Sequence, residues 1–190
     1  MMFLTFGTLG NNASTNFSGK IYEQNYTQIE KRFYWGSDIT PIELQNEKNK
    51  KEIMCMAKNI FFEAATESTA GKLAVAQVVF NRVNSDNFPN TVCDVVYQGP
   101  HYTGANGQLF PVRDRCQFSW YCDGRGDEPS QSRLWNESQK LAEHIFKYKD
   151  KYIDITDGAT HYHANYIDDP RWARADRRTA SIDQHHFFRL

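Results

Sequence analysis

A segment that is apolar on nearly every face, from about Ala70 to Arg82, most constrains the fold of this 190-residue chain. Its apolar side chains follow one another with almost no polar interruption: Leu73, Val75, Ala76, Val78, Val79 and Phe80. A helix of this kind needs cover from several sides, as in the core of a domain. Ser68 or Thr69 can cap its first turn. The sequence therefore predicts a central buried helix around which the rest of the domain packs.

The preceding segment places a carboxylate, Glu63, inside a run of aromatic and small residues. Apolar residues recur there at three- and four-residue steps, which predicts an amphipathic helix: Ile53, Met56, Ala57, Ile60, Phe61 and Ala64. Glu63 lies at the edge of this stripe, near the end of the helix. An ionised Glu is almost never fully buried without a partner. Two interpretations fit, a half-exposed carboxylate paired with Lys58 or Arg82, and a catalytic acid whose pKa is raised by desolvation.

A series of short motifs follows in the same order as in a known family. The motifs cover most of residues 50–190: Ile60–Ala64, Glu67, Gly71, Ala74–Ala76, Val78–Val79, Asn81–Val83, Phe88–Pro89, Thr91–Cys93, Val95–Tyr97, Cys116–Ser119, Ala159–Ala164, Pro170, Trp172 and His186–Phe188. With them the chain resembles the cell wall hydrolase family typified by bacterial spore-cortex-lytic enzymes. Two features depart from that family. The usual Glu-Ala-Arg-Gly-Glu box here reads Glu-Ala-Ala-Thr-Glu from Glu63 to Glu67, and residues 101–115 are inserted as a Gly- and Asn-rich loop.

The resemblance implies a fold and an activity. The fold is lysozyme-like, of the α+β class and mainly α-helical, over residues 50–190, with a small β-hairpin between Ala159 and Phe188 beside a cleft. The activity is cleavage of the MurNAc–GlcNAc bond of peptidoglycan by lytic transglycosylation, with Glu63 as acid and base and with no cofactor. Protonation of the glycosidic oxygen requires at least one carboxylic acid beside that oxygen.

Polar and aromatic residues in the matched motifs are candidates for substrate binding: Glu67, Gln117, Ser119, Tyr162, His163 and Trp172. Glu67 can equally serve as an acceptor that orders a loop. Tyr97 and Trp120 can stack on sugar rings or belong to the core. A hydrolase would more often use a second carboxylate facing the first, for which the candidates are Glu67, Asp94 and Asp123.

Two alternatives come from other classes of protein. His161 and His163 have a common metal-ligand spacing on a strand. With His185 or His186, and a carboxylate such as Asp168, they would form the zinc site of an N-acetylmuramoyl-L-alanine amidase. The other alternative is a non-catalytic wall-binding or phage structural module, against which the retained Glu63 argues.

Charge and cysteine content restrict the remaining possibilities. The chain has 22 basic and 23 acidic residues, which gives no electrostatic case for nucleic acid. It contains no apolar run long enough to span a bilayer. Cys116 and Cys122 bracket a short loop and can form a disulfide, whereas Cys55 is interpreted as a small buried residue. The four cysteines do not decide the redox compartment.

Residues 1–49 differ in composition from the rest and are predicted to form an arm or linker. Because the N-terminus lacks a recognisable signal peptide, we expect a phage-encoded enzyme that is carried in the virion. It would act on the cell wall from the periplasmic side, and the arm would tether it to tail or internal virion proteins. The alternative is an endolysin that stays in the host cytoplasm until lysis.

Overall fold

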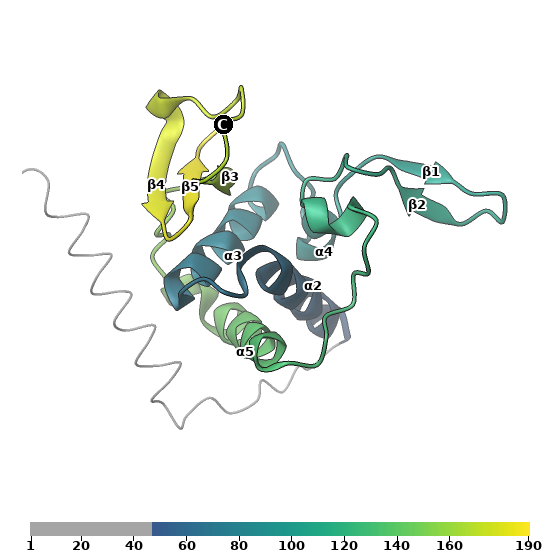
Figure 1. The fold of residues 1–190 in the computed structure, drawn as a ribbon. Coiled ribbons are helices and arrows are strands. Elements are labelled where there is room, and N and C mark those ends of the chain that lie inside the picture. The colour runs from purple at the N-terminus through teal and green to yellow at the C-terminus, as the bar shows by residue number, and fades with distance from the viewer. Residues whose placement is uncertain (1–46) are drawn as a thin grey trace, which may run out of the picture.

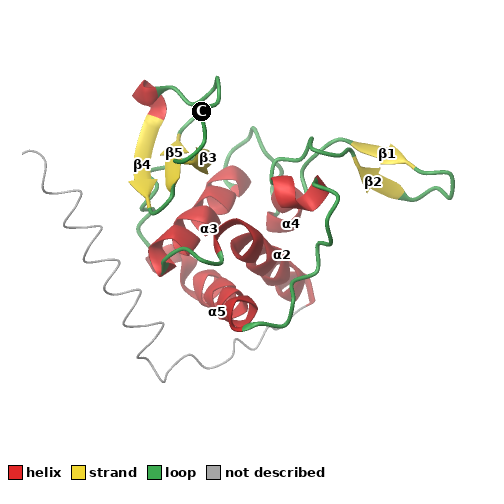
Figure 2. Cartoon of the chain, in the orientation of Figure 1, coloured by secondary structure: helices red, strands yellow, loops and turns green. Residues whose placement is uncertain are grey.

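The computed structural model describes residues 47–190, so the predicted N-terminal arm lies outside the described residues except for positions 47–49. The described elements follow in this order (Figures 1 and 2): α2 (Glu47–Ala64), α3 (Thr69–Val83), α4 (Val92–Val96), β1 (His101–Thr103), β2 (Leu109–Pro111), the 3-10 helix η1 (Ser119–Cys122), α5 (Arg133–Tyr148), the 3-10 helix η2 (Lys149–Lys151), β3 (His161–Ala164), the 3-10 helix η3 (Ala175–Arg177), β4 (Arg178–Ile182) and β5 (His185–Phe188). The predicted class, α+β and mainly α, is confirmed. No described helix has the length and apolar character that a membrane span needs.

Helix α3 is buried on two sides, which explains its nearly continuous apolar sequence. Leu73, Ala76 and Val79 pack into the main core, which α3 shares with α2, α4 and α5. Other α3 side chains form a second cluster with the C-terminal sheet: Ala70, Ala74 and Val78 from the helix with Ala159, Ile182 and Phe187. Figure 1 shows α3 between the other helices and this sheet. The prediction of a central buried helix is confirmed.

Side-chain caps fix where the helices begin. The hydroxyl of Ser68 accepts a 3.3 Å hydrogen bond from the backbone N–H of Gly71 at the start of α3. Thr91 accepts one of 3.1 Å from the N–H of Asp94 in α4, as its sequence predicts. Helix α5 begins at Arg133, because Ser132 provides its cap.

The C-terminal sheet has three antiparallel strands in the order β3-β5-β4, with Tyr162 opposite Phe187. This corrects the expected hairpin between residues 159 and 188. The segment 182–188 contains a turn at Asp183 and Gln184, and the hairpin is formed by β4 and β5. Asp183 has a positive φ of 49°, a conformation that Asp adopts more readily than most residues. The turn was missed because the sequence there contains no Gly or Pro.

The turn between β4 and β5 docks on the first turn of α3. Oδ2 of Asp183 accepts hydrogen bonds from the backbone N–H of Ser68 at 3.0 Å and from its hydroxyl at 2.5 Å. A carboxylate at this end of a helix is favoured by the helix dipole. Gly71 allows the close approach, since a Cβ there would overlap the Asp183 carboxylate and lie 2.9 Å from Cβ of Glu67. The contact between Asp183 and Ser68 therefore holds the sheet against the end of the loop between α2 and α3.

Residues 101–115 are not the open loop that their composition suggested. They contain the antiparallel hairpin of β1 and β2, in which Tyr102 lies opposite Phe110. Its connecting turn includes Gly107, with a φ of 78°, and it extends away from the helical body in Figure 1. Cross-strand pairing of aromatic residues stabilises such a ladder. The Gly- and Asn-rich composition indicated a loop, and it does not show that the two aromatic residues pair.

Two disulfides are present. Cys116 pairs with Cys122, as the short loop between them allowed. Cys55 pairs with Cys93, so the interpretation of Cys55 as an unpaired buried residue is wrong. This second bond joins α2 to α4 across 38 positions of sequence. Sequence spacing alone could not show that these two helices pack side by side.

Candidate active site

Glu63 lies in the last turn of α2 and faces a cavity of about 610 Å³ between η1 and the C-terminal sheet. Polar, charged and aromatic side chains share this cavity: Phe62, Glu63, Arg82, Cys116, Gln117, Phe118, Ser119, Trp120, Asp123, Arg125, Gly126, Tyr162, His163, Ala164, Tyr166, Ile167 and His185. The lining thus combines elements that are distant in sequence. A cavity of this size with a few converging polar groups is typical of a ligand site.

Tyr162 holds the Glu63 carboxyl group in place. Its hydroxyl donates a 2.9 Å hydrogen bond to Oε2 of Glu63 from the middle of β3. The Tyr162 ring in turn packs against Phe187, at 5.6 Å between centroids, and against His185 at 5.2 Å. The carboxylate is therefore positioned by a side chain that is itself fixed by the sheet.

Arg82 is a buried cation in the same cavity. Its Nε donates a 2.7 Å hydrogen bond to the carbonyl oxygen of Thr160, at the start of β3. The guanidinium lies over the rings of Phe88 and Phe118, with Cζ 5.3 and 5.0 Å from their centroids. Such cation–π contacts stabilise a desolvated Arg. Arg82 thus links the end of α3 to the strand that carries Tyr162.

These surroundings act on the Glu63 proton in opposite directions. Burial raises the pKa of the Glu63 carboxyl above its ordinary value of 4.5, because the ionised form loses its hydration. The hydrogen bond from Tyr162 and the charge of Arg82 both favour the carboxylate and partly oppose this effect. Burial and the nearby Glu63 raise the pKa of Tyr162 well above 10, so its phenol stays a donor. The net effect is a pKa for Glu63 that is raised above its ordinary value.

The pairing of Glu63 with Lys58, considered from the sequence, does not occur. Nζ of Lys58 instead lies 2.7 Å from a carboxylate oxygen of Glu128. Arg82, the other expected partner, influences Glu63 through its charge.

Four of the predicted substrate-binding residues share the cavity with Glu63: Gln117, Ser119, Tyr162 and His163. The other two do not line it. Glu67 accepts a 3.3 Å hydrogen bond from the backbone N–H of Gln184, which is the loop-ordering role considered for it. The Trp172 ring lies against His161 and Phe188, at 5.4 and 5.5 Å, on the face of β3 opposite Tyr162.

Of the candidates for a second carboxylate, Asp123 also lines the cavity. Its Oδ1 accepts a 2.8 Å hydrogen bond from the backbone N–H of Arg125, so it also orders its own turn. Asp94 bonds to the Thr91 hydroxyl at 2.7 Å and lies on α4, outside the cavity lining. Asp123 is therefore the carboxylate to test beside Glu63.

The histidines do not assemble the ligand set that a zinc amidase would need. Residues 47–190 include no group of three or more His, Cys, Asp or Glu side chains placed to hold a metal ion. The polar contacts of His161 and His163 are with residues close to them in sequence. Nδ1 of His161 contacts the Thr160 hydroxyl at 3.0 Å, and Nε2 of His163 lies 3.5 Å from Oδ1 of Asp169 without an aligned hydrogen bond. Burial, with the nearby Arg82, lowers the pKa of His161 to about 4.

Sequence reasoning named Arg82 as a possible partner of Glu63 but missed its bond to Thr160, and it missed the position of His185. An Arg at the end of an otherwise apolar helix was the available signal for the first. His185 lines the cavity beside Tyr162, and burial lowers its pKa. No local pattern indicates this, because its position depends on how β5 pairs with β3.

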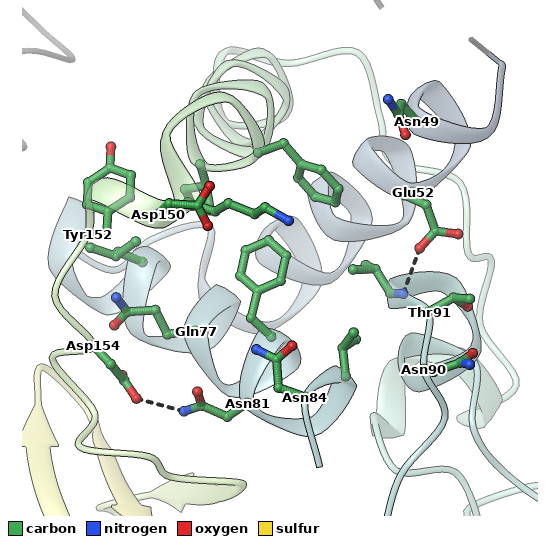
Figure 3. Close-up of a pocket in the computed structure, with 17 residues that line it drawn as sticks. Asn49, Glu52, Gln77, Asn81, Asn84, Asn90, Thr91, Asp150, Tyr152 and Asp154 are labelled. Atoms are coloured by element: carbon green, nitrogen blue, oxygen red, sulfur yellow. Dashed lines mark hydrogen bonds between the residues drawn. The ribbon is translucent and has the colours of Figure 1, made fainter. Parts of the chain in front are cut away.

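A second cavity, of about 540 Å³, lies on another side of α3 and is shown in Figure 3. Several of its polar side chains already bond within the protein. Gln77 bonds to the backbone of Ile153 and Ile155, and Glu52 accepts a 2.6 Å bond from the N–H of Val92. Asn81 donates to Asp154 at 2.9 Å, one of the bonds drawn in Figure 3. We interpret these groups as structural, and Glu63 marks the other cavity as the candidate active site.

Fold and site together define a small, mainly helical domain with a half-buried, hydrogen-bonded glutamate in a cleft beside a sheet. A family model matches residues 66–188, and the chain belongs to the Cell Wall Hydrolase family. The match begins three positions after Glu63, so the role of that residue rests on the geometry described above.

Named proteins with related sequences are spore cortex-lytic enzymes. That of Bacillus cereus is 38% identical over 118 residues, which cover 53% of this chain and 46% of the relative. That of Halalkalibacterium halodurans is 30% identical over 112 residues, covering 50% and 34%. The chain thus matches less than half the length of these relatives. The crystal structure of the catalytic domain of the Bacillus cereus SleB protein is similar in fold, with a TM-score of 0.51 and 23% identity over 74% of this chain and 91% of that one.

Proposed function

We propose that this protein cleaves the glycan strands of peptidoglycan between MurNAc and GlcNAc, as a lytic transglycosylase with Glu63 as its acid and base. The observation that carries the proposal is the half-buried Glu63 carboxyl group, held by Tyr162 in a cavity large enough for a ligand. Membership of the Cell Wall Hydrolase family and similarity to spore cortex-lytic enzymes support the choice of substrate.

In the first step the protonated Glu63 donates its proton to the glycosidic oxygen, and the bond from that oxygen to the anomeric carbon breaks. The raised pKa of Glu63 matters here, because a carboxyl group that is ionised at the working pH has no proton to give. The positive character that develops at the sugar ring lies close to the new Glu63 carboxylate, which stabilises it.

In the second step the same carboxylate accepts the proton of the sugar's 6-hydroxyl group. The freed oxygen attacks the anomeric carbon and closes a 1,6-anhydro ring, so the reaction consumes no water. The Tyr162 hydroxyl favours the ionised form of Glu63 that exists between the steps. A single residue can serve both steps because the proton it loses in the first is replaced in the second.

The role of Asp123 distinguishes this mechanism from hydrolysis. An inverting hydrolase would use it as the base that activates a water. Its hydrogen bond to the Arg125 N–H favours a role in ordering the turn. The Asp123→Asn variant should therefore retain most activity, whereas a hydrolase that depends on Asp123 would lose it.

Mass spectrometry of the fragments released from purified cell walls tests the proposal directly. We expect 1,6-anhydro-muramic ends, and a loss of about 10²–10⁴-fold in the Glu63→Gln variant. Reducing sugar ends would instead indicate a hydrolase, and free stem peptides would indicate an amidase. Circular dichroism and a thermal melt of the variant show whether the fold survives the change.

We further propose that the protein works outside the reducing cytosol, on the cell wall. Its two disulfides support this, because such bonds persist mainly in oxidising compartments. Carriage in a phage virion, with residues 1–49 as the tether, stays a prediction. Deletion of residues 1–46 should leave wall-degrading activity intact and remove the protein from purified particles.

A further inference from the structure

The hairpin of β1 and β2 carries two aromatic rings on one face. Tyr102 and Phe110 are cross-strand partners, so their side chains lie on the same side of the ladder. Their ring centroids are 5.7 Å apart with an angle of 28° between the planes, and Tyr102 is 56% exposed. Gly104 makes room for the Phe110 ring, because a Cβ there would lie 2.8 Å from it. The two rings are stacked and form a small aromatic surface, defined as the Tyr102–Phe110 face.

The hairpin is anchored to the wall of the active-site cavity. Imidazole Nε2 of His101 contacts the Tyr121 hydroxyl at 3.1 Å, and the N–H of Asp114 donates to the Cys122 carbonyl at 3.0 Å. The disulfide from Cys116 to Cys122 closes the same junction. Strands of three residues are too short to be stable without such support.

The anchoring residues adjoin the side chains that line the cavity. Tyr121 and Cys122 belong to η1, whose Ser119 and Trp120 line it, and Cys116 lines it directly. The base of the hairpin therefore adjoins the wall of the candidate active site, and a polymer longer than the cavity can reach the hairpin.

The chemistry of the hairpin favours a carbohydrate as the molecule that covers this face. Its turn, residues 104–108, is polar, and its Asn106 and Gln108 side chains bond to each other at 3.3 Å. A hairpin that enters a membrane would need apolar residues at that end. Residues 101–111 contain no Lys or Arg for a phosphate backbone. Aromatic faces suit the C–H surface of a pyranose ring. The C–H hydrogens carry a slight positive charge and are attracted to the negative face of the aromatic ring.

We propose that the Tyr102–Phe110 face is a secondary glycan-binding site, which holds a peptidoglycan strand several sugars away from the bond that Glu63 cleaves. The inference rests on the proposed function for its polymer substrate. The site would act on long strands and on insoluble wall, where part of the polymer lies beyond the cavity. It would contribute nothing to a fragment short enough to occupy the cavity alone.

The test compares the Tyr102→Ala/Phe110→Ala variant with Leu109→Ala as the matched control. Leu109 lies opposite Thr103, on the other face of the same hairpin, and is 64% exposed. Co-sedimentation with purified sacculi should weaken by about tenfold in the double variant, a change that corresponds to ~1.4 kcal/mol of binding free energy. KM for sacculi should rise similarly, with kcat/KM for a soluble tetrasaccharide of the wall unchanged. The control should match the wild type in both assays.

The double variant should keep the global melting temperature of the wild type, because both rings lie outside the core and their pairing supports only the hairpin itself. Equal losses on sacculi and on the tetrasaccharide would overturn the proposal, as would unchanged binding of sacculi. Binding of the hairpin to lipid vesicles that the double variant loses, with sacculi binding intact, would also overturn it. If the wild type cleaves neither substrate but the double variant still loses sacculi binding, the proposed function fails and the glycan-binding site stands.

Discussion

The hydroxyl of Tyr162 donates a 2.9 Å hydrogen bond to Oε2 of Glu63, although the two residues are 99 positions apart. This contact joins the last turn of the first described helix to the C-terminal sheet. Any movement of the sheet relative to α2 would therefore change the environment of the carboxyl group. The hydrogen bonds between Asp183 and Ser68 hold the sheet against α3. They therefore help to keep Tyr162 in position beside Glu63.

The Tyr162→Phe variant should retain the fold and lose the bond to Glu63. Because that bond favours the carboxylate, its removal raises the pKa of Glu63 further. The alkaline limb of the pH profile of kcat/KM should move to higher pH. The maximal rate should fall by roughly tenfold or more, since a hydrogen bond to a charged group contributes ~1.5–3 kcal/mol.

The control for this variant is Tyr148→Phe, which removes a hydroxyl from α5, outside the cavity lining. It should leave both the rate and the pH profile unchanged. A pH profile that moves to lower pH in Tyr162→Phe would mean that the phenol stabilises the protonated acid instead.

The Glu63→Gln variant should be more stable than the wild type above neutral pH. The folded-state pKa of Glu63 is raised above its ordinary value of 4.5, so the folded protein binds this proton more tightly than the unfolded chain. Stability of the wild type therefore falls as pH rises from about 4.5 through the folded-state pKa. Glutamine is neutral at every pH and avoids this loss.

Urea unfolding between pH 4 and pH 8 measures this difference in the free energy of unfolding. The stability advantage of Glu63→Gln should shrink as the pH approaches 4.5 from above. A variant that is less stable than the wild type across the whole range would show that the ionised carboxylate stabilises the fold.

The sequence predicted the parts of this site that depend on local pattern. Glu63 near the end of its helix, the buried helix after it and the cap of that helix at Ser68 all follow from periodicity or from residues a few positions apart. Tyr162 was found because it lies in a motif of a known family. The pairing of Cys55 with Cys93, the place of His185 and the turn at Asp183 depend on which elements pack together, and no local signal indicates that.

The Gly71→Ala variant should be less stable than the wild type, although Ala is normally the better helix former by about 1 kcal/mol. Its Cβ would overlap the Asp183 carboxylate, which is held in place by both hydrogen bonds to Ser68. Forcing an extra methyl group into a packed site costs ~1–3 kcal/mol. Because the turn would move away from α3, wall-degrading activity should fall too.

Gly126→Ala provides a matched control, since a Cβ at that position meets no atom within 4 Å. Its melting temperature should be close to that of the wild type. An unchanged or raised melting temperature in Gly71→Ala would mean that the turn between β4 and β5 can shift without loss.

Removal of the two disulfides should have different effects. The bond from Cys55 to Cys93 spans 38 positions and joins two helices of the main core, whereas that from Cys116 to Cys122 spans six. In the chain-entropy model a longer closed loop restricts the unfolded chain more, and the difference between these two loops is about 1.5 kcal/mol. The Cys55→Ala/Cys93→Ala variant should therefore lose more unfolding free energy than Cys116→Ala/Cys122→Ala in a denaturant titration. Cys116 lines the active-site cavity and its disulfide anchors the hairpin. Removal of this bond should therefore lower activity on sacculi even where the free energy of unfolding changes little. The opposite order of stabilities would show that the short loop, and not the joining of α2 to α4, secures the folded domain.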